Sequence, residues 1–118
     1  MSAVNPSQVL RAPHTVSVAP TETTLDSFTR AELRTAKRIT VQVYHANAGQ
    51  VFTGIVYVKQ TGMTDFAIYD DTQLVAASTV SKIIVVDTGG FDLIEVRGTL
   101  SGAGGNVQTG TTRISNSP

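Results

Sequence analysis

From residue 36 onward, the chain alternates apolar and polar residues in short runs that are separated by polar, glycine-containing turns. This pattern constrains the fold more than any other feature. Residues 37–44 show it clearly, because Ile39, Val41 and Val43 alternate with polar side chains. A period of two residues places the apolar side chains on one face of a β-strand. The sequence therefore predicts a ladder of half-buried strands.

Seven or eight strands are expected along this ladder, at a spacing of roughly 8–12 residues. Their predicted ranges are 37–44, 51–60, 65–69, 74–78, 82–86, 91–100 and 107–114. Residues 51–60 are apolar on both faces, which predicts a central strand covered on two sides. Residues 82–86 form an apolar run that we expect to be buried. The fold class predicted is all-β, as an antiparallel β-sandwich or a jelly-roll-like barrel.

The first 24 residues follow a different pattern. Three prolines, Pro6, Pro13 and Pro20, exclude a helix and interrupt any long strand. The apolar residues of this segment are Val4, Val9, Leu10, Val16 and Val18. Apolar side chains without a core of their own usually lie along another surface, although a solvated tail is the alternative. We therefore expect an extended N-terminal arm, residues 1–24, ahead of a β-sandwich domain, residues 25–118; residues 15–19 alternate and could add one edge strand.

Residues 25–36, where the two parts meet, fit either a short helix or an extended chain. Thr29 and Glu32 have the spacing of a capping box, which favours a helix start. The threonines of this segment favour extended structure instead. Both alternatives stay open at this point.

Charge and cysteine content exclude several classes of function. Nine Lys and Arg residues balance nine Asp and Glu residues, so nothing favours nucleic acid or an anionic membrane as a partner. The absence of cysteine excludes disulfides and thiolate metal sites. No apolar run approaches the ~20 residues of a membrane span, and no signal-peptide pattern begins the chain. We expect a soluble, non-secreted product.

One basic cluster stands out against this neutral background. It consists of Arg30, Arg34, Lys37 and Arg38, whereas the later part of the chain leans acidic. Such an asymmetry can orient self-assembly, and it is also common on an ordinary solvated surface.

The sequence Asp87-Thr88-Gly89 is the sharpest catalytic motif. It matches small dimeric aspartic proteases, in which one carboxylate from each subunit shares a proton. In a protease of this size, however, most of the chain follows the motif, whereas here it lies close to the C-terminus. A strand-ending aspartate and a glycine turn explain the same residues, so we do not expect an enzyme.

Metal and cofactor sites are not expected either. Asp65, Asp70 and Asp71 lack the oxygen spacing of a calcium loop. His14 and His45 have no ligand at a suitable spacing, so we expect both to face solvent.

Four aromatic residues provide the remaining candidate site, and they are Tyr44, Tyr57, Phe66 and Tyr69. Together they could form a platform for sugars or bases, although cross-strand packing is an equally good explanation. Tryptophan, which commonly anchors sugars, is absent.

The segment from Leu25 to Val43 resembles the opening of a β domain in virion proteins of tailed bacteriophages. The resemblance rests on Leu-Asp-Ser-Phe at 25–28, Arg-Thr-Ala-Lys at 34–37 and the alternating strand at 39–43. It extends at the level of pattern to about Ile114. It implies a structural module of capsid decorations, necks, tails or fibre bases, and not an enzyme.

The same resemblance implies a role for the arm, since N-terminal arms in virions commonly cross onto neighbouring subunits. We expect a non-enzymatic capsid decoration or cement protein that bridges capsid subunits through its arm and loops. Its partners would be other virion proteins, chiefly the major capsid protein, and further copies of itself, for example as a trimer. It would be made in the host bacterial cytoplasm and located in the virion, with no nucleic acid, membrane or cofactor bound. The residues expected at the partner contact are Val4, Val9, Leu10, Val16, Val18, Arg34 and Arg38.

Three alternatives remain. Within the same class, the chain could be a neck, tail or fibre-adaptor subunit. From another class, it could be a glycan-binding β-sandwich module. An aspartic protease at Asp87 is the remote third.

Overall fold

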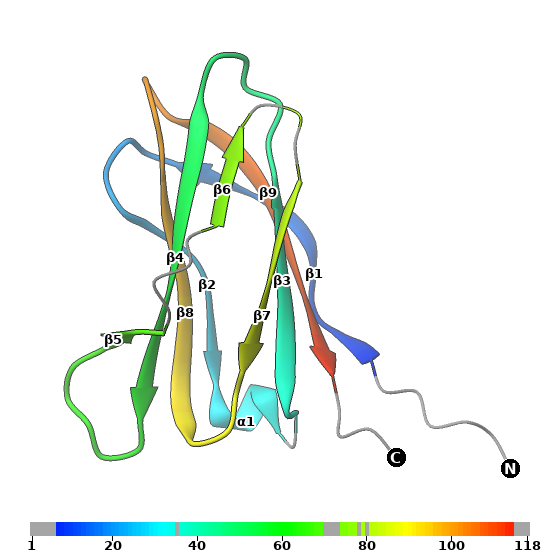
Figure 1. Cartoon of the computed structure of the whole chain (residues 1–118), viewed down its shortest axis with the longest axis vertical. Coiled ribbons are helices and arrows are strands. Elements are labelled where there is room, and N and C mark those ends of the chain that lie inside the picture. Colours follow the sequence, from blue (N-terminus) through cyan, green and yellow to red (C-terminus); the bar gives the residue numbers. More distant parts are fainter. Residues whose placement is uncertain (1–6, 35, 70–73, 78, 80, 115–118) are drawn as a thin grey trace, which may run out of the picture.

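The computed structural model describes residues 7–34, 36–69, 74–77, 79 and 81–114. These residues form nine β-strands and one short helix (Figure 1). In chain order the elements are β1 (Ser7–Val18), β2 (Thr23–Thr29), α1 (Arg30–Leu33), β3 (Arg38–Tyr44), β4 (Val51–Gln60), β5 (Ala67–Ile68), β6 (Leu74–Ala77), β7 (Lys82–Asp87), β8 (Phe91–Leu100) and β9 (Gly105–Ile114).

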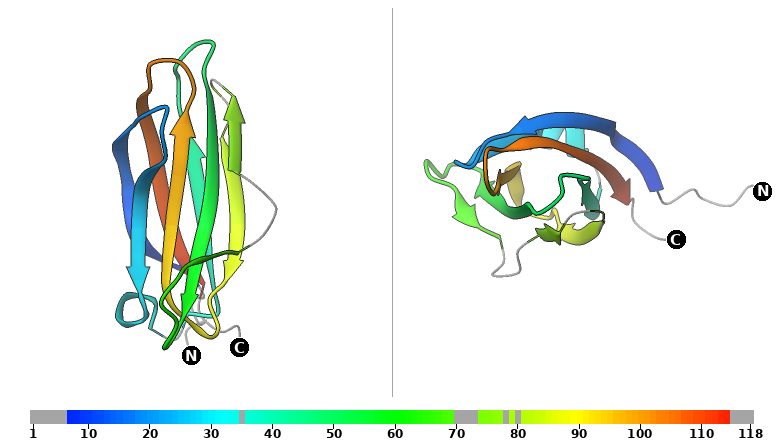
Figure 2. Two further views of the ribbon diagram at one scale, coloured as in Figure 1. Left: turned by 90° about the vertical axis from the view of Figure 1, so that its left-hand side faces the viewer. Right: turned by 90° about the horizontal axis from the view of Figure 1, so that it is seen from above.

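The strands form two antiparallel sheets that face each other as layers (Figure 2). Sheet A has the order β1-β9-β3-β7, and sheet B has the order β2-β8-β4-β5, with β6 also paired to β4. The chain therefore crosses from one sheet to the other at nearly every connection. Apart from the two-residue β5, this is the strand order of a double-sheet jelly roll, which joins two Greek keys. The predicted all-β sandwich is confirmed.

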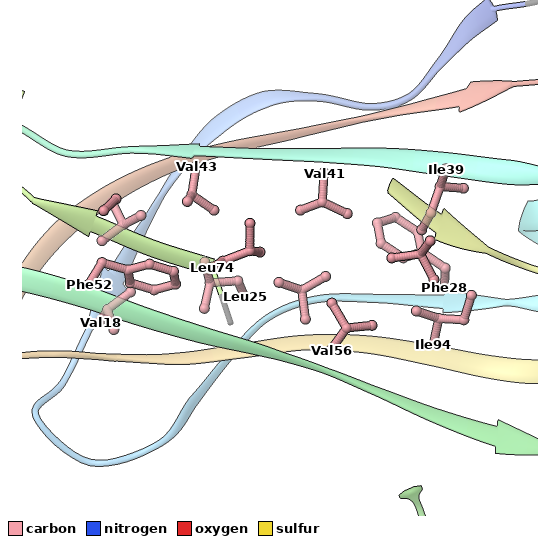
Figure 3. Close-up of a cluster of buried hydrophobic side chains, with 14 of the residues drawn as sticks. Val18, Leu25, Phe28, Ile39, Val41, Val43, Phe52, Val56, Leu74 and Ile94 are labelled. Carbon is pink, nitrogen blue, oxygen red and sulfur yellow. The ribbon is translucent and has the colours of Figure 1, made fainter. Parts of the chain in front are cut away.

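The core lies between the two sheets and is built by strict alternation along the strands (Figure 3). Ile39, Val41 and Val43 on β3 are completely buried, as the two-residue period predicts. Phe28 on β2 and Ile94 on β8 are equally buried on the opposite layer. Burial of each such side chain contributes about 1.5–3 kcal/mol, so this interior is the main source of stability.

Two glycines in sheet B make room for the largest ring in the core. Gly54 on β4 is directly opposite Gly98 on β8. A Cβ atom on Gly98 would lie 2.4 Å from the Phe52 ring, and one on Gly54 would lie 2.7 Å from it. The ring of Phe52, which is completely buried, thus occupies the space that two side chains would otherwise take.

Residues 7–18 of the N-terminal segment form β1 and are hydrogen-bonded into sheet A. β1 pairs with β9 from Ser7 opposite Ile114 to Val18 opposite Gly105. The register shifts between Arg11 and His14, which is where Pro13 lies. A bulge accommodates proline because the residue has no N–H to give to the ladder. The predicted boundary between arm and domain, after residue 24, falls inside β2.

Two predictions about strand burial were wrong. β7 is buried only on its inner face, at Val86, and it leaves Ile83 at 59% and Val85 at 48% exposure on its outer face. β4 is central, but only its inner face is buried, and its outer face is half-buried. In both cases the cause is the same: two layers alone cover one face of each sheet. The expected strand at 65–69 is also shorter, since only Ala67–Ile68 pair.

The junction between β2 and β3 is a single helical turn with the predicted capping box. The N–H of Glu32 donates to Thr29 Oγ1 at 3.4 Å, and the N–H of Thr29 donates to Glu32 Oε1 at 3.1 Å. Arg30 fixes the turn to the β7–β8 connection by donating to the carbonyl oxygens of Thr88 and Phe91. Among the described residues, no helix has the length and apolar character to cross a membrane.

Candidate functional site

Within the part of the chain that the structure describes, sheet A has two edges without a further strand and one face without a covering layer, and these surfaces are the candidates for interaction. β1 forms one edge and β7 forms the other (Figure 1). The outer face, between them, carries the side chains that alternate with the core residues.

The edge at β7 has backbone groups that point away from the sheet. Thr88 donates its N–H to the carbonyl of Lys37 at 3.0 Å. The backbone N–H and C=O groups of Thr88 and of every second residue before it therefore point toward β3. The backbone groups of the residues between them point away from β3, toward the open edge. Asp87 confirms this, because its N–H donates to the Tyr69 hydroxyl at 2.9 Å. The outward N–H and C=O groups of Ile83 and Val85 have no partner within the described residues.

The side chains of this edge are apolar where natural edges are usually protected. Ile83 and Val85 project from the outer face of sheet A and are largely exposed. The strand carries its charges, Lys82 and Asp87, only at its ends. Proline, inward charges or lysines within an edge normally prevent strand-to-strand association, and residues 83–86 contain none of them.

The edge at β1 offers less of its apolar surface than the sequence suggested. Val9 is 65% exposed, whereas Leu10 and Val16 are half-buried against the core. Val18 is 1% exposed and packs inside the sandwich, which removes it from any surface that a partner could touch. Val4 lies outside the described residues.

The basic cluster separates into one structural and two exposed arginines. Arg30 is held by carbonyl oxygens at the β7–β8 turn. Arg34 ends α1 with a positive φ of 54° and is exposed. Arg38 is exposed at the start of β3, next to the end of β9. β1 begins beside the same end of β9, so Val9, Arg34 and Arg38 belong to one end of the sandwich.

A polar cluster closes the seam between β1 and β2, and it corrects the prediction that His14 faces solvent alone. The Nε2 atom of His14 lies 3.0 Å from Asp26 Oδ1, and Arg11 Nε lies 3.7 Å from the same oxygen. Asp26 is only 7% exposed. Its burial raises the pKa of the carboxyl above the ordinary value, and the nearby His14 and Arg11 only partly oppose that rise.

His45 is also buried, which contradicts the expected exposure at a turn. Its side chain is 2% exposed, with Nε2 at 2.8 Å from the carbonyl oxygen of Ala76. Nδ1 accepts the N–H of Asn47 at 3.1 Å, so Nε2 carries the proton and donates to Ala76. This ring connects β6 to the turn after β3. Nothing local in the sequence signals this contact, because its partner Ala76 lies on another strand.

A hollow of about 270 Å³ lies on the outer face of sheet A. Its lining includes Tyr44 opposite Gln108, Thr40 opposite Thr112, and Gln42 opposite Gly110. Gly110 has no side chain and so leaves the middle of the face open, with Pro13 packed at its border. The hydroxyl and amide groups of Tyr44, Gln42 and Gln108 make no hydrogen bond within the described residues.

The four aromatic residues do not form a single platform. Tyr57 on β4 and Phe66 just before β5 both contact the Arg97 guanidinium, which lies 4.1 Å and 5.0 Å from the two ring centres. Tyr69 makes an edge-to-face contact with Phe91 at 6.1 Å. Tyr44 lines the hollow on sheet A, apart from the other three.

The described residues bring no catalytic or metal-binding set together. Asp87 is exposed at the end of β7, and Thr88 beside it is buried and donates its hydroxyl to the carbonyl of Ala36. Within the same residues, no group of three His, Asp or Glu side chains could hold a metal ion. Asp65 is exposed, and Asp70 and Asp71 lie outside the described part of the chain.

Comparison with known proteins bears on the fold alone. No family model matches the sequence, and no curated protein matches it. A chain of the Gx strain of infectious bursal disease virus aligns with 90% of this chain and 30% of its own length, at 10% identity and a TM-score of 0.51. A chain of the disulfide-linked pili that form Bacillus endospore appendages aligns over 98% of both chains, at 16% identity and a TM-score of 0.42. The viral chain supports the sandwich fold, and the pilus chain aligns too loosely to add to it.

Proposed function

We propose that this chain is a non-enzymatic structural subunit of a bacteriophage virion, and that it acts there as a capsid decoration protein. The observation that carries the proposal is the open character of sheet A, whose two edges expose Val9 on one side and Ile83 and Val85 on the other. Large apolar side chains gathered on unpaired edges are typical of subunits that work by assembling. The resemblance of residues 25–43 to phage virion modules supports the same class.

The contact with the capsid would form at the α1 end of the sandwich. Val9 supplies an apolar side chain there, and Arg34 and Arg38 supply two exposed positive charges. A capsid surface that combines apolar and acidic side chains would complement this end. Because β1 is held along β9, the contact would be made by a rigid strand whose ordering costs little on binding. A neck, tail or fibre-adaptor subunit would use the same surface against a different partner.

Virions of the phage that encodes the chain provide the test. We expect mass spectrometry of purified particles to detect the protein, and cryo-electron microscopy to locate it on the outer capsid surface. Absence from the particles would refute the virion assignment, and density at the neck or tail would replace the decoration role with the adaptor role.

The contact surface is tested with variants of the chain in the same particles. Val9→Ser combined with Arg34→Glu and Arg38→Glu should fold and lose incorporation into particles. Val51→Ser is the matched control, because Val51 is 41% exposed on β4, which belongs to the other sheet. Equal incorporation of both variants would remove the α1 end from the proposal.

The hollow on sheet A favours a second candidate, a glycan-binding module. Its ring, amides and hydroxyls are the groups that stack on a sugar and hydrogen-bond its hydroxyls, and Tyr44, Gln42 and Gln108 are unengaged within the described residues. Binding measured on a glycan array and by calorimetry should disappear with Tyr44→Ala. Tyr57→Ala is the control, since Arg97 already covers that ring. No saturable binding to any glycan would eliminate this candidate.

A further inference from the structure

We infer that two copies of this chain associate through their β7 edges, so that sheet A continues from one copy into the other across a two-fold axis. This inference deepens the proposed function, since it names a second copy as one partner of the assembling subunit. It rests on three features of β7: its backbone groups that have no partner among the described residues, its exposed apolar side chains, and the hydrogen bond from the Asp87 N–H to Tyr69 at the end of its edge.

Symmetry decides which residues can be opposite each other. Two antiparallel strands related by a two-fold axis perpendicular to the sheet keep the same face outward. The side chains of Ile83 and Val85 lie on the outer face, so each must be opposite an outer-face residue of the other copy. The side chain of Ile84 lies on the inner face and must be opposite an inner-face residue. Ile83 and Val85 also carry the free N–H and C=O groups, so the side chains and the backbone select the same residues.

Three registers meet this condition, and their side-chain partners and Tyr69 distinguish among them. In one register Ile83 is opposite Val85 of the other copy, and Ile84 is opposite itself. In the second register Val85 is opposite itself, and Ile83 meets Asp87. In the third register Ile83 is opposite itself and Val85 meets Ser81, so Val85 has no apolar partner. The second register is blocked, because the Asp87 N–H already donates to the Tyr69 hydroxyl. The first register uses every free group of Ile83 and Val85 and ends where Tyr69 closes the edge.

The side chains of the first register are complementary. Ile83 and Val85 of both copies form one apolar cluster on the outer face, which covers surface that is 59% and 48% exposed in the single chain. Cross-strand pairs of this kind contribute about 0.2–1 kcal/mol each. Asp87 is opposite Ser81 of the other copy, so no like charges meet. An interface of one strand is small, and we therefore expect a dimer that depends on concentration.

This register also separates the two Asp87 side chains. Each lies opposite Ser81, six positions from the other copy's Asp87 along the strand, which corresponds to about 20 Å. Two carboxylates at that distance cannot share a proton as they do in a dimeric aspartic protease.

Cysteine trapping tests the register in a chain that has no cysteine of its own. In the proposed register Ile84 forms a pair without backbone hydrogen bonds, with its two Cα atoms about 4.5 Å apart, which suits a disulfide. Ile84→Cys should give a covalent dimer under mild oxidation while retaining the circular dichroism spectrum of the native chain. Val85→Cys, which is opposite itself only in the blocked register, should give much less. Stronger linkage through Val85→Cys, or none through either variant, would overturn the proposal.

Sedimentation equilibrium on the unmodified chain tests the association itself. We expect the mass to rise from one copy to two with concentration, and to stay at one copy for the double variant Ile83→Lys, Val85→Lys. Val51→Lys, in the other sheet, should dimerise as the native chain does. A native chain that is monomeric at every concentration refutes the inference. If the mass instead grows beyond two copies, and Val9→Lys stops this growth, then β7 of one copy pairs with β1 of the next, and the proposed dimer is wrong. Each result is independent of the presence of the protein in virions.

Discussion

Two buried polar residues, Asp26 and His45, add polar contacts between elements of the two sheets to the hydrophobic packing of the core. Asp26 connects β2 to β1 through Arg11 and His14, and His45 connects the turn after β3 to β6. The sequence predicted neither role, because each depends on partners brought close only by the fold. Periodicity predicts which face of a strand is buried, but it does not predict which polar side chain finds a partner there.

Replacing His45 should destabilise the fold. In His45→Ala, the carbonyl of Ala76 and the N–H of Asn47 lose their partners in a buried place. Each unsatisfied group costs about 1–3 kcal/mol, so the free energy of unfolding should fall by at least about 2 kcal/mol. Urea denaturation followed by circular dichroism measures this. Tyr44→Ala, at a neighbouring but surface position, is the control, and an equal loss for both variants would contradict the role given to the ring.

Asp26 should make the stability depend on pH in an unusual direction. Burial raises its pKa, so between the unfolded value of 3.8 and the raised folded value the native state binds more protons than the unfolded state. Its contribution to stability is thus present at low pH and is lost as the pH rises through the folded pKa. The free energy of unfolding of the native chain minus that of Asp26→Asn should fall across this window. A difference that rises with pH would mean that pairing with Arg11 and His14 outweighs burial.

At the scale of the element, the sequence predicted strands better than their positions in the sheets. Alternation located β3 and β8 almost to the residue, because half-burial leaves a direct mark on the sequence. It misplaced β7, because an apolar run on an exposed edge reads like a buried strand. What separates the two is the strand order, which depends on contacts between distant segments. β7, whose position at an edge the sequence did not predict, is also the strand through which we infer that the dimer forms.

The glycines of β4 and β8 provide a prediction at this scale. Gly98→Ala places a Cβ atom 2.4 Å from the Phe52 ring, which is completely buried, so the ring has to shift within the core. Overpacking of this kind costs about 1–3 kcal/mol. The matched control is Gly89→Ala, because a Cβ atom there meets nothing within 4 Å. Thermal unfolding should show a lower midpoint for Gly98→Ala alone. Equal midpoints would indicate that the ring moves freely.

For the whole molecule, the jelly roll changes what the N-terminal segment can do. The sequence predicted an extended arm ahead of a domain. Its resemblance to phage virion modules implied that this arm crosses onto a neighbouring subunit. In the described residues the segment is instead strand β1, which lies along the whole of β9 and buries Val18. Its contribution to assembly is therefore proposed to come from the outward side chain of Val9, while the strand itself belongs to the sandwich.

Removal of β1 should accordingly unfold the domain. Deleting residues 1–19 uncovers β9 along its length and takes Val18 out of the core. We expect loss of the cooperative thermal transition and binding of a hydrophobic dye, both measured on the purified chain. A matched pair of substitutions separates packing from mere length: Val18→Ser should cost about 2 kcal/mol or more, because it removes a buried apolar group and buries a hydroxyl. Val9→Ser, at an exposed position of the same strand, should cost little. A truncated chain that still unfolds cooperatively would show that β1 is a separable arm and that the rest of the sandwich is stable without its pairing to β9.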